Sequence, residues 1–227
     1  VFTGVDITGY GADLPGKPTL AQMIKRTLSQ VPKLERLRLS SLDPIEIDPD
    51  LIALFGTEPR LMPHVHLSLQ AGDNMILKRM KRRHLREDAL DVCKRLRAIR
   101  QDIIFGADFI AGFPTETEEM FKNTLNIVEE CDISYLHVFP YSARRGTPAA
   151  RMPQVPKEII KTRASTLREM GKKRLHEFLQ MQLNRSLNVL VERNFKGHTD
   201  HFAPVQLVGD HLDVNWVGKI IPVKVIE

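Results

Sequence analysis

One run of apolar residues and the break after it constrain the fold more than any other part of this chain. Residues 103–111 are apolar enough, and rich enough in β-forming residues, to predict a strand buried on both faces. The chain then breaks at Gly112 and Pro114. It restarts at Thr115 or Thr117, each a candidate N-cap, with carboxylates and then apolar residues at helical spacing. The segment therefore predicts a buried strand, a loop and an amphipathic helix.

The predicted loop lies where parallel α/β folds collect ligands. Asp108, Gly112 and Glu116 come at or near the carboxyl end of the predicted strand, and ligands bind at that edge of parallel sheets. A plain turn between a strand and a helix would have the same sequence features. Glu116 is either a base or, as we favour, a carboxylate at a helix N-terminus.

Strand and helix patterns alternate along most of the chain. We expect four more strands at residues 1–6, 34–39, 65–69 and 133–140, and helices that begin near Thr19, Asp48, Glu87 and Lys157. This alternation predicts right-handed β-α-β units and a parallel sheet. Five strands are too few to close an eight-stranded barrel, so the α/β part is expected to be an open or partial barrel.

The sequence pattern changes after a long helix predicted from Lys157 to about Leu183. Short strands are expected at residues 187–191, 203–208, 212–217 and 220–226, with turns at Lys196-Gly197, Gly209-Asp210 and Gly218-Lys219. We therefore divide the chain into residues 1–183 and 184–227. The second part is expected to be a small antiparallel β-barrel of about five strands.

Charge and cysteine content limit the class of protein. The formal net charge is +5, and basic residues concentrate in segments 78–100 and 144–174, which suggests RNA as a partner or else solvated helix faces. Cys93 and Cys131 fit helical patterns among apolar neighbours and are expected to be reduced core thiols of a cytoplasmic protein. No apolar run is long enough for a membrane span, and no membrane partner is expected.

Five motifs, taken together and in this order, resemble those of the radical S-adenosylmethionine (SAM) methylthiotransferases. They are Phe2-Thr3-Gly4-Val5-Asp6-Ile7-Thr8-Gly9-Tyr10-Gly11, Arg38-Leu39-Ser40-Ser41-Leu42-Asp43-Pro44, His64 to Asp73 with Met80-Lys81-Arg82, Gly106 to Glu119, and Tyr141-Ser142-Ala143-Arg144-Arg145-Gly146-Thr147-Pro148-Ala149. The resemblance covers about residues 1–180. It is strongest to the branch that modifies threonylcarbamoyladenosine in tRNA, and the C-terminal part is similar to the family's RNA-binding TRAM module.

The resemblance implies a partial (β/α)6 TIM-like barrel that lacks its first strand or strands. It also implies SAM and two [4Fe-4S] clusters in the full-length protein, with the tRNA anticodon stem-loop as substrate. The implied reaction adds a methylthio group to C2 of N6-threonylcarbamoyladenosine. The alternatives are a methylthiotransferase for isopentenyladenosine, one for a ribosomal-protein aspartate, or an RNA-binding scaffold without chemistry.

The family's cluster motif, Cys-x-x-x-Cys-x-x-Cys, is not found in this sequence. Cys93 and Cys131 are its two cysteines, and neither lies in such a motif. The chain starts inside a predicted strand and without an initiator methionine, so we read it as a fragment. We expect the cluster cysteines upstream of Val1. This chain by itself is expected to bind no metal cluster, to contain no catalytic residue and to be inactive.

Matching positions carry the family's binding roles onto this sequence. The implied SAM contacts are Thr3, Gly4, Asp6, Ser68, Gln70, Asp108, Ile110 and Gly112. The implied substrate or RNA contacts are Arg82, Tyr141, Arg144, Lys196, His198 and Phe202. Gln70 and Asp108 are otherwise structural caps. His64 and His66, two apart on a strand, are metal ligands or, as we favour, strand-packing residues.

Four residues at three sites depart from the family pattern. Ala71 and Thr115 stand where relatives commonly have serine and glycine, and His84-Leu85 replaces an aromatic-threonine pair. These departures weaken the resemblance to the threonylcarbamoyladenosine branch more than the resemblance to the family.

Overall fold

A three-stranded parallel sheet organises the first part of the molecule. The structure is a computed structural model and describes residues 1–209 and 212–226. Its first sheet contains β1 (His64–Gln70), β2 (Ile104–Ala111) and β3 (Ile133–Pro140), in the order β1-β2-β3. Both pairings are parallel, as the alternation of strands and helices predicts.

The first two predicted strands are reduced to isolated bridges. Phe2 pairs with Leu39. The segment around Leu39 pairs with Leu61, which precedes β1, through Leu37, and with Leu67 of β1 through Leu42; all three bridges are parallel. The prediction of full strands at residues 1–6 and 34–39 is therefore wrong in extent. Beyond Phe2 the first segment has no strand partner, and residues 3–6 are exposed instead of lying in the sheet. Even so, the parallel segments follow one another across the molecule in chain order.

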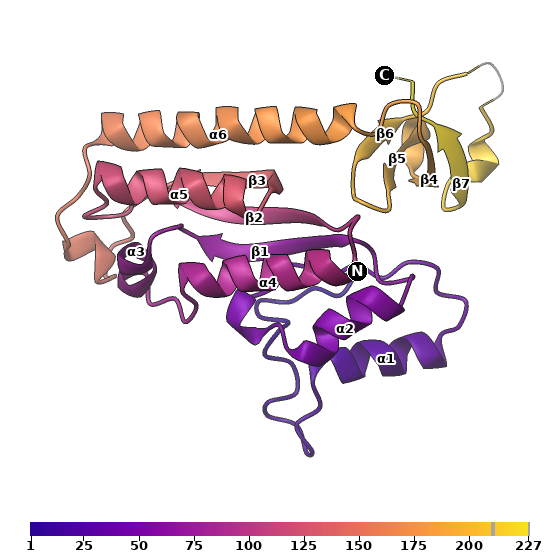
Figure 1. Ribbon diagram of the computed structural model, residues 1–227, viewed down its shortest axis with the longest axis horizontal. Helices are drawn as coiled ribbons and strands as arrows, with labels where there is room; N and C mark the ends of the chain where they lie inside the picture. The colour runs from indigo at the N-terminus through magenta and orange to yellow at the C-terminus, as the bar shows by residue number, and fades with distance from the viewer. Residues whose placement is uncertain (210–211, 227) are drawn as a thin grey trace.

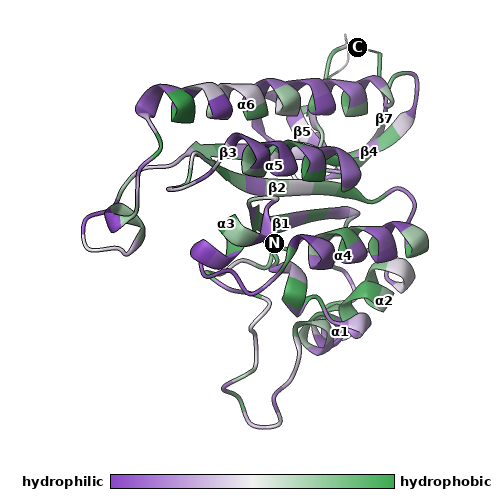
Figure 2. Ribbon diagram, turned by 60° about the vertical axis from the view of Figure 1, so that its left-hand side comes forward, coloured by the Kyte–Doolittle hydropathy of each residue, from purple (hydrophilic) through white to green (hydrophobic). Residues whose placement is uncertain are grey.

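Helices connect the parallel segments. Their bounds are α1 (Leu20–Gln30), α2 (Pro49–Thr57), α3 (Asn74–Arg79), α4 (Arg86–Ile99), α5 (Glu118–Glu130) and α6 (Lys157–Gln180), with short 3-10 turns η1 (Pro44–Glu46) and η2 (Ala149–Arg151). In Figure 2, α4, α5 and α6 each carry both hydrophilic and hydrophobic residues, as helices packed on a core do. Within the described parts of the chain, no helix combines the length and apolar character needed to cross a membrane.

The helix starts predicted at Thr19 and Asp48 are confirmed by their capping bonds. The Thr19 hydroxyl accepts a hydrogen bond from the Gln22 amide at 3.3 Å, and Asp48 accepts one from the Leu51 amide at 2.7 Å. Of the two candidates for α5, Thr117 is the cap, since its hydroxyl accepts a hydrogen bond from the Met120 amide at 3.2 Å.

The two faces of the parallel sheet differ in burial. Alternate residues such as Leu67, Phe105, Ala107 and Phe109 are fully buried and form one core with residues from α1, α2, α4, α5 and α6. On the other face, Asp108 and Ile110 are only half-buried. The prediction that residues 103–111 are buried on both faces is therefore wrong, because the helices of the core cover a single face.

An antiparallel sheet forms the C-terminal part. Its strands are β4 (Ser186–Val191), β5 (Lys196–Thr199), β6 (Pro204–Gln206) and β7 (Ile220–Lys224), in the order β6-β5-β4-β7, with 3-10 turns η3 (Arg193–Phe195) and η4 (Val214–Trp216). Figure 1 shows this sheet in yellow at the far end of α6. The described residues thus form four strands, where we predicted a barrel of about five.

The C-terminal part differs from the sequence prediction in two local elements. Residues 212–217 were predicted as a strand, but the Asp213 side chain accepts a bond from the Asn215 amide at 2.8 Å and caps η4 instead. Lys196-Gly197 was predicted as a turn and lies in β5; a Cβ at Gly197 would come within 2.4 Å of the Leu190 carbonyl oxygen on β4. The predicted Gly209-Asp210 turn includes Asp210, which is outside the described residues.

Two arginines join the C-terminal sheet to the parallel part. Arg36 donates to the carbonyl oxygens of His198 and Asn188 at 3.2 and 3.0 Å, and pairs with Asp200 at 2.6 Å. Arg38 donates to the Thr199 carbonyl, and its guanidinium lies 5.0 Å from the centre of the Phe202 ring. The interface therefore includes charge-assisted bonds from two arginines to backbone carbonyl oxygens of the C-terminal sheet.

We predict that Arg36→Met lowers the free energy of unfolding by about 2 kcal/mol, because it removes the donor of two backbone carbonyl oxygens and the partner of Asp200. Urea unfolding monitored by the fluorescence of Trp216, the chain's single tryptophan, measures this change. Arg145→Met is the control, since the Arg145 side chain forms no hydrogen bond or ion pair with the described residues. Equal unfolding curves for the two variants would contradict the role given to Arg36.

Candidate functional site

The half-buried face of the parallel sheet carries four of the polar side chains that the sequence singled out, His64, His66, Ser68 and Asp108. We define this open face by the side chains that alternate with the core residues and share register: His64, His66 and Ser68 of β1, Asp108 and Ile110 of β2, and Tyr135, His137 and Phe139 of β3. Side chains from all three strands therefore lie together on one face of the sheet.

Three ionisable side chains converge at the middle of the open face. His66 Nε2 lies 3.0 Å from Asp108 Oδ1, and His137 Nδ1 lies 3.2 Å from the same oxygen. The two imidazole rings are 4.7 Å apart between centroids. Burial acts to raise the pKa of Asp108, but its bond to His66 and the nearby His137 outweigh burial, and the pKa is lowered. Asp108 is thus held as a carboxylate.

A second polar group lies beside the first strand-like segments. Asp6, Ser68 and Arg82 line one small cavity of about 170 Å³, together with Val5, Thr8, Ser41, Asp43, Lys81 and Arg83. Arg82 donates to Asp43 at 3.1 Å and to the Ser68 carbonyl at 2.8 Å. Thr3 and Gly4 are exposed and outside this lining. The fold therefore brings Asp6, Ser68 and Arg82 together, from three distant segments of the chain.

Asp43 is the anionic centre of this cavity and was not singled out by the sequence. The His84 Nδ1 atom lies 3.4 Å from Asp43 Oδ1, and Arg83 Nη2 lies 3.7 Å from Asp43 Oδ2. Burial raises the pKa of Asp43, but the His84 ring and the Arg82 guanidinium lower it by more. Asp43 is far in sequence from Arg82, Arg83 and His84, so no local sequence pattern indicated this cluster.

The loop after β2 is held by a buried ion pair. Glu116 Oε2 accepts hydrogen bonds from the Gly112 amide at 2.9 Å and from Arg163 of α6 at 2.8 Å. Glu116 therefore holds the loop to α6. It precedes the Thr117 cap, so the favoured prediction of a carboxylate at the helix N-terminus is wrong. Gly112 has φ of +77°, and a Cβ there would meet Ile160 of α6 at 2.5 Å. The glycine is required by helix packing, and its amide already has a partner.

The remaining predicted residues lie at the two ends of the sheet. Gln70 ends β1 in a left-handed conformation (φ +68°) after a register shift. Tyr141 packs edge-on against Phe113 with centroids 5.4 Å apart, and Arg144 is exposed. Lys196 is exposed on β5.

His198 and Phe202, predicted to contact RNA, are engaged within the protein at the start of β1. Their rings stack at 4.6 Å, and Phe202 also stacks on His64 at 5.6 Å. Phe202 keeps 42% of its surface exposed. RNA stacking on Phe202 therefore has to use the part of the ring that His64 and His198 leave uncovered.

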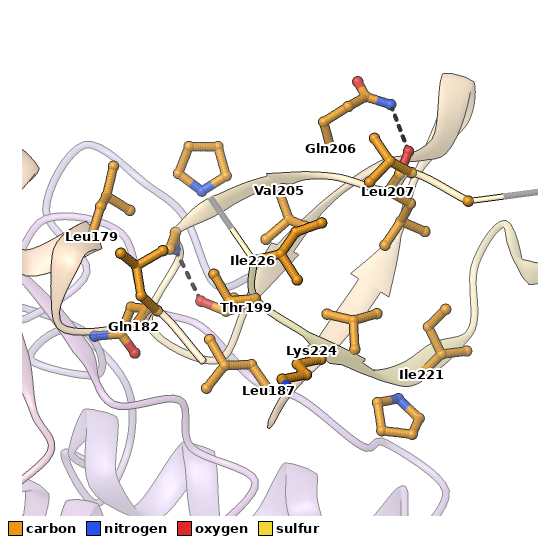
Figure 3. A pocket seen from close by; sticks show the side chains of 18 of the residues that line it. Leu179, Gln182, Leu187, Thr199, Val205, Gln206, Leu207, Ile221, Lys224 and Ile226 are labelled. Atoms are coloured by element: carbon orange, nitrogen blue, oxygen red, sulfur yellow. Dashed lines mark hydrogen bonds between the residues drawn. The ribbon is translucent and has the colours of Figure 1, made fainter. Parts of the chain in front are cut away.

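A second, larger cavity lies elsewhere in the molecule. It measures about 960 Å³, and its lining is mainly apolar residues from the end of α6 and from the C-terminal sheet; Figure 3 shows Leu179, Leu187, Val205 and Ile221 around it. None of the residues predicted to bind cofactor or RNA lines this cavity. The polar side chains singled out by the sequence thus lie on the open face and around the small cavity, and not in this apolar cavity.

Comparison with protein-family models decides the family. The chain matches the model described as the radical SAM superfamily over residues 5–128, which is more than half of its length. This chain belongs to the radical SAM superfamily. The matched region contains β1, β2 and every predicted SAM-contacting residue except Thr3 and Gly4.

Curated relatives resemble this radical SAM chain over most of its length. It is 57% identical over 207 residues, 91% of the chain, to the threonylcarbamoyladenosine tRNA methylthiotransferase MtaB of Rickettsia prowazekii. It is 40% identical over 236 residues to a tRNA-2-methylthio-N(6)-dimethylallyladenosine synthase of Rickettsia rickettsii. The chain spans about half the length of these relatives, 49% and 52%.

A solved structure supports the fold. Coproporphyrinogen III oxidase (HemN) from Escherichia coli, described as a radical SAM enzyme, has a TM-score of 0.54 and 20% identity to this chain. The likeness covers 70% of this chain and 38% of that one. At this identity the comparison bears on the fold alone.

The radical SAM chain does not by itself fit an iron–sulfur cluster. Such clusters are held by several thiolates, and its two cysteines, Cys93 and Cys131, are both buried in the core. The polar residues around the 170 Å³ cavity and on the open face, in contrast, suit the polar parts of a nucleoside ligand.

Thr115 adopts a left-handed backbone conformation that is unfavourable for threonine. Its φ is +68°, which is strained for a β-branched residue, and its hydroxyl accepts a hydrogen bond from Arg79 at 2.7 Å. Alanine and glycine both remove that bond, but only glycine removes the strain. We expect Thr115→Gly to be about 1 kcal/mol more stable than Thr115→Ala in urea unfolding. An alanine variant as stable as the glycine variant would contradict the strain.

Asp43 predicts a pH dependence. Its pKa is lowered in the folded protein, so its stabilising contribution is present above the unfolded pKa of about 3.9 and is lost as the pH falls through the folded value. We expect Asp43→Asn to destabilise at pH 7, with a difference from the parent that shrinks between pH 5 and pH 3. Urea midpoints across this range measure it. Asp13→Asn, at an exposed position, should leave the pH profile unchanged; a pH-independent effect of Asp43→Asn would refute the prediction.

Proposed function

We propose that this chain is part of a tRNA methylthiotransferase that modifies C2 of N6-threonylcarbamoyladenosine beside the anticodon. The observation that carries this proposal is the 57% identity to a threonylcarbamoyladenosine tRNA methylthiotransferase, against 40% to the dimethylallyladenosine enzyme. Because the chain spans half of those relatives, its activity is a property of the whole protein.

The proposed architecture is a partial (β/α)6 barrel in residues 1–183 and a TRAM-like module in residues 184–227. The parallel segments follow one another in chain order, from Phe2 through Leu39 to β3. The core helices cover one face. That arrangement is typical of a singly wound barrel, since doubly wound sheets reverse their strand order and cover both faces.

SAM is proposed to bind across the open face and the adjoining small cavity. Asp6 and Ser68 offer polar groups around that cavity, and Ile110 offers an apolar surface beside Asp108. When bound with its clusters, SAM supplies the radical and the methyl group. The residues of this chain bind and orient it, and the cluster cysteines are proposed to lie outside residues 1–227.

The tRNA is proposed to approach the carboxyl ends of the strands. Tyr141 and Arg144 follow β3 there, and Arg144 is exposed. Arg82 is committed to Asp43 and Ser68, so its role is to shape the cavity, with phosphate contact left to exposed cations. Lys196, on the C-terminal sheet, is one of these.

Mass spectrometry of tRNA tests the function. In a strain that lacks the whole gene, we expect the methylthio group of threonylcarbamoyladenosine to disappear and that of isopentenyladenosine to remain. Expression of the whole protein should restore it, while the 227-residue chain alone should not. Loss of the isopentenyladenosine modification instead, or persistence of both, would overturn the proposal.

A further inference from the structure

Three ionisable side chains on the open face converge on one another, and Asp108 alone among them was predicted to contact SAM. They are His66 of β1, Asp108 of β2 and His137 of β3, and one nitrogen or oxygen atom of each lies within 4.8 Å of the others. The strands that carry them are hydrogen-bonded neighbours, and Asp108 and His137 are direct register partners. The set therefore belongs to the sheet itself and not to a loop.

We propose that His66 Nε2, Asp108 Oδ1 and His137 Nδ1 bind one divalent first-row transition-metal ion, such as Zn²⁺ or Fe²⁺. Two imidazoles and one carboxylate are a recurrent ligand set for these ions, whereas Mg²⁺ prefers oxygen ligands. With metal–ligand distances near 2.0–2.1 Å, tetrahedral ligand atoms are about 3.3 Å apart. The observed 3.0 and 3.2 Å separations are close to that spacing.

The surroundings of His66 hold its ring in a ligating position. His66 is 9% exposed. At Gly106, its register partner on β2, a Cβ would lie 2.5 Å from His66 Nδ1. Any residue larger than glycine would therefore displace the ring. Ligands on packed strands are held more closely than ligands on loops.

The third ligand leaves the site accessible. The His137 side chain is 62% exposed, whereas those of His66 and Asp108 are 11% and 19% exposed. A metal ion can therefore enter from the His137 side and keep one or more positions for water or another oxygen ligand. His64 is not part of the set, since its ring packs edge-on against Tyr135 and stacks on Phe202.

The competing explanation is a hydrogen-bonded network without metal, in which Asp108 accepts one bond from each imidazole. Both explanations use the same distances, but they differ in what the side chains do when metal is offered. A nitrogen that donates its proton to Asp108 must lose that proton to bind a metal ion. Stoichiometric metal binding therefore separates the two.

The test is a metal titration of the 227-residue chain, purified without a histidine tag, metal-free and with its thiols reduced. Co²⁺ is the optical probe, Zn²⁺ is the competitor and Mg²⁺ is the oxygen-preferring control. We expect one Co²⁺ per chain, with visible d–d absorption that Zn²⁺ abolishes and Mg²⁺ does not. Asp108→Asn and His137→Gln preserve shape and should each weaken Co²⁺ binding more than about tenfold.

His176→Gln is the matched control, because His176 is exposed on α6 away from the set, and it should bind Co²⁺ as the parent does. Circular dichroism confirms that each variant is folded; His137→Gln changes an exposed side chain and keeps the test usable if a buried variant fails. The proposal is overturned by the absence of stoichiometric Co²⁺ binding or by unchanged binding in His137→Gln. A thiolate-to-cobalt charge-transfer band, which would assign the metal to Cys93 or Cys131, also overturns it.

Discussion

The in-register parallel pairing of β1, β2 and β3 is the constraint on which the rest of the structure depends. Because side chains alternate along each strand, the pairing sends one set into the helix-covered core and the other onto the open face. A one-residue slip of β2 would exchange Phe109 for Asp108 in the core. The large cost of burying that carboxylate without its partners fixes the register and, with it, the His66–Asp108–His137 set.

Helix α6 packs against the parallel sheet from the loop after β2 to the start of β3. Near its start, Ile160 and Arg163 pack on the loop after β2. At its middle, Gly171 allows Leu136 of β3 to approach, since a Cβ there would lie 3.0 Å away. Near its end, Phe178 packs edge-on against Tyr135, with centroids 5.9 Å apart. The helix runs the length of β3 and reaches the C-terminal sheet (Figure 1).

The C-terminal sheet is attached by groups that also suit RNA. Arg36 and Arg38 bind its backbone, and Phe202 stacks between His198 and His64. A cation or aromatic ring used within the protein is only partly available to a nucleic acid. The orientation of the module is therefore fixed by the same residue types that its proposed partner would contact, and exposed Lys196 and Arg144 are left for phosphate.

The sequence by itself determined the order of the parallel segments, the helix caps at Thr19 and Asp48, and the family, since these depend on local spacing and on motif residues. Only the tertiary structure decided which residues meet. Asp43 joins His84, and His137 joins Asp108, across gaps in sequence that no local pattern spans. Residue type alone predicted a strand at residues 212–217. The structure instead has the 3-10 turn η4 there, capped by the Asp213 side chain. Strand register and helix packing join residues that are far apart in the sequence. The groups around Asp43 and Asp108 could therefore be identified only from the tertiary structure.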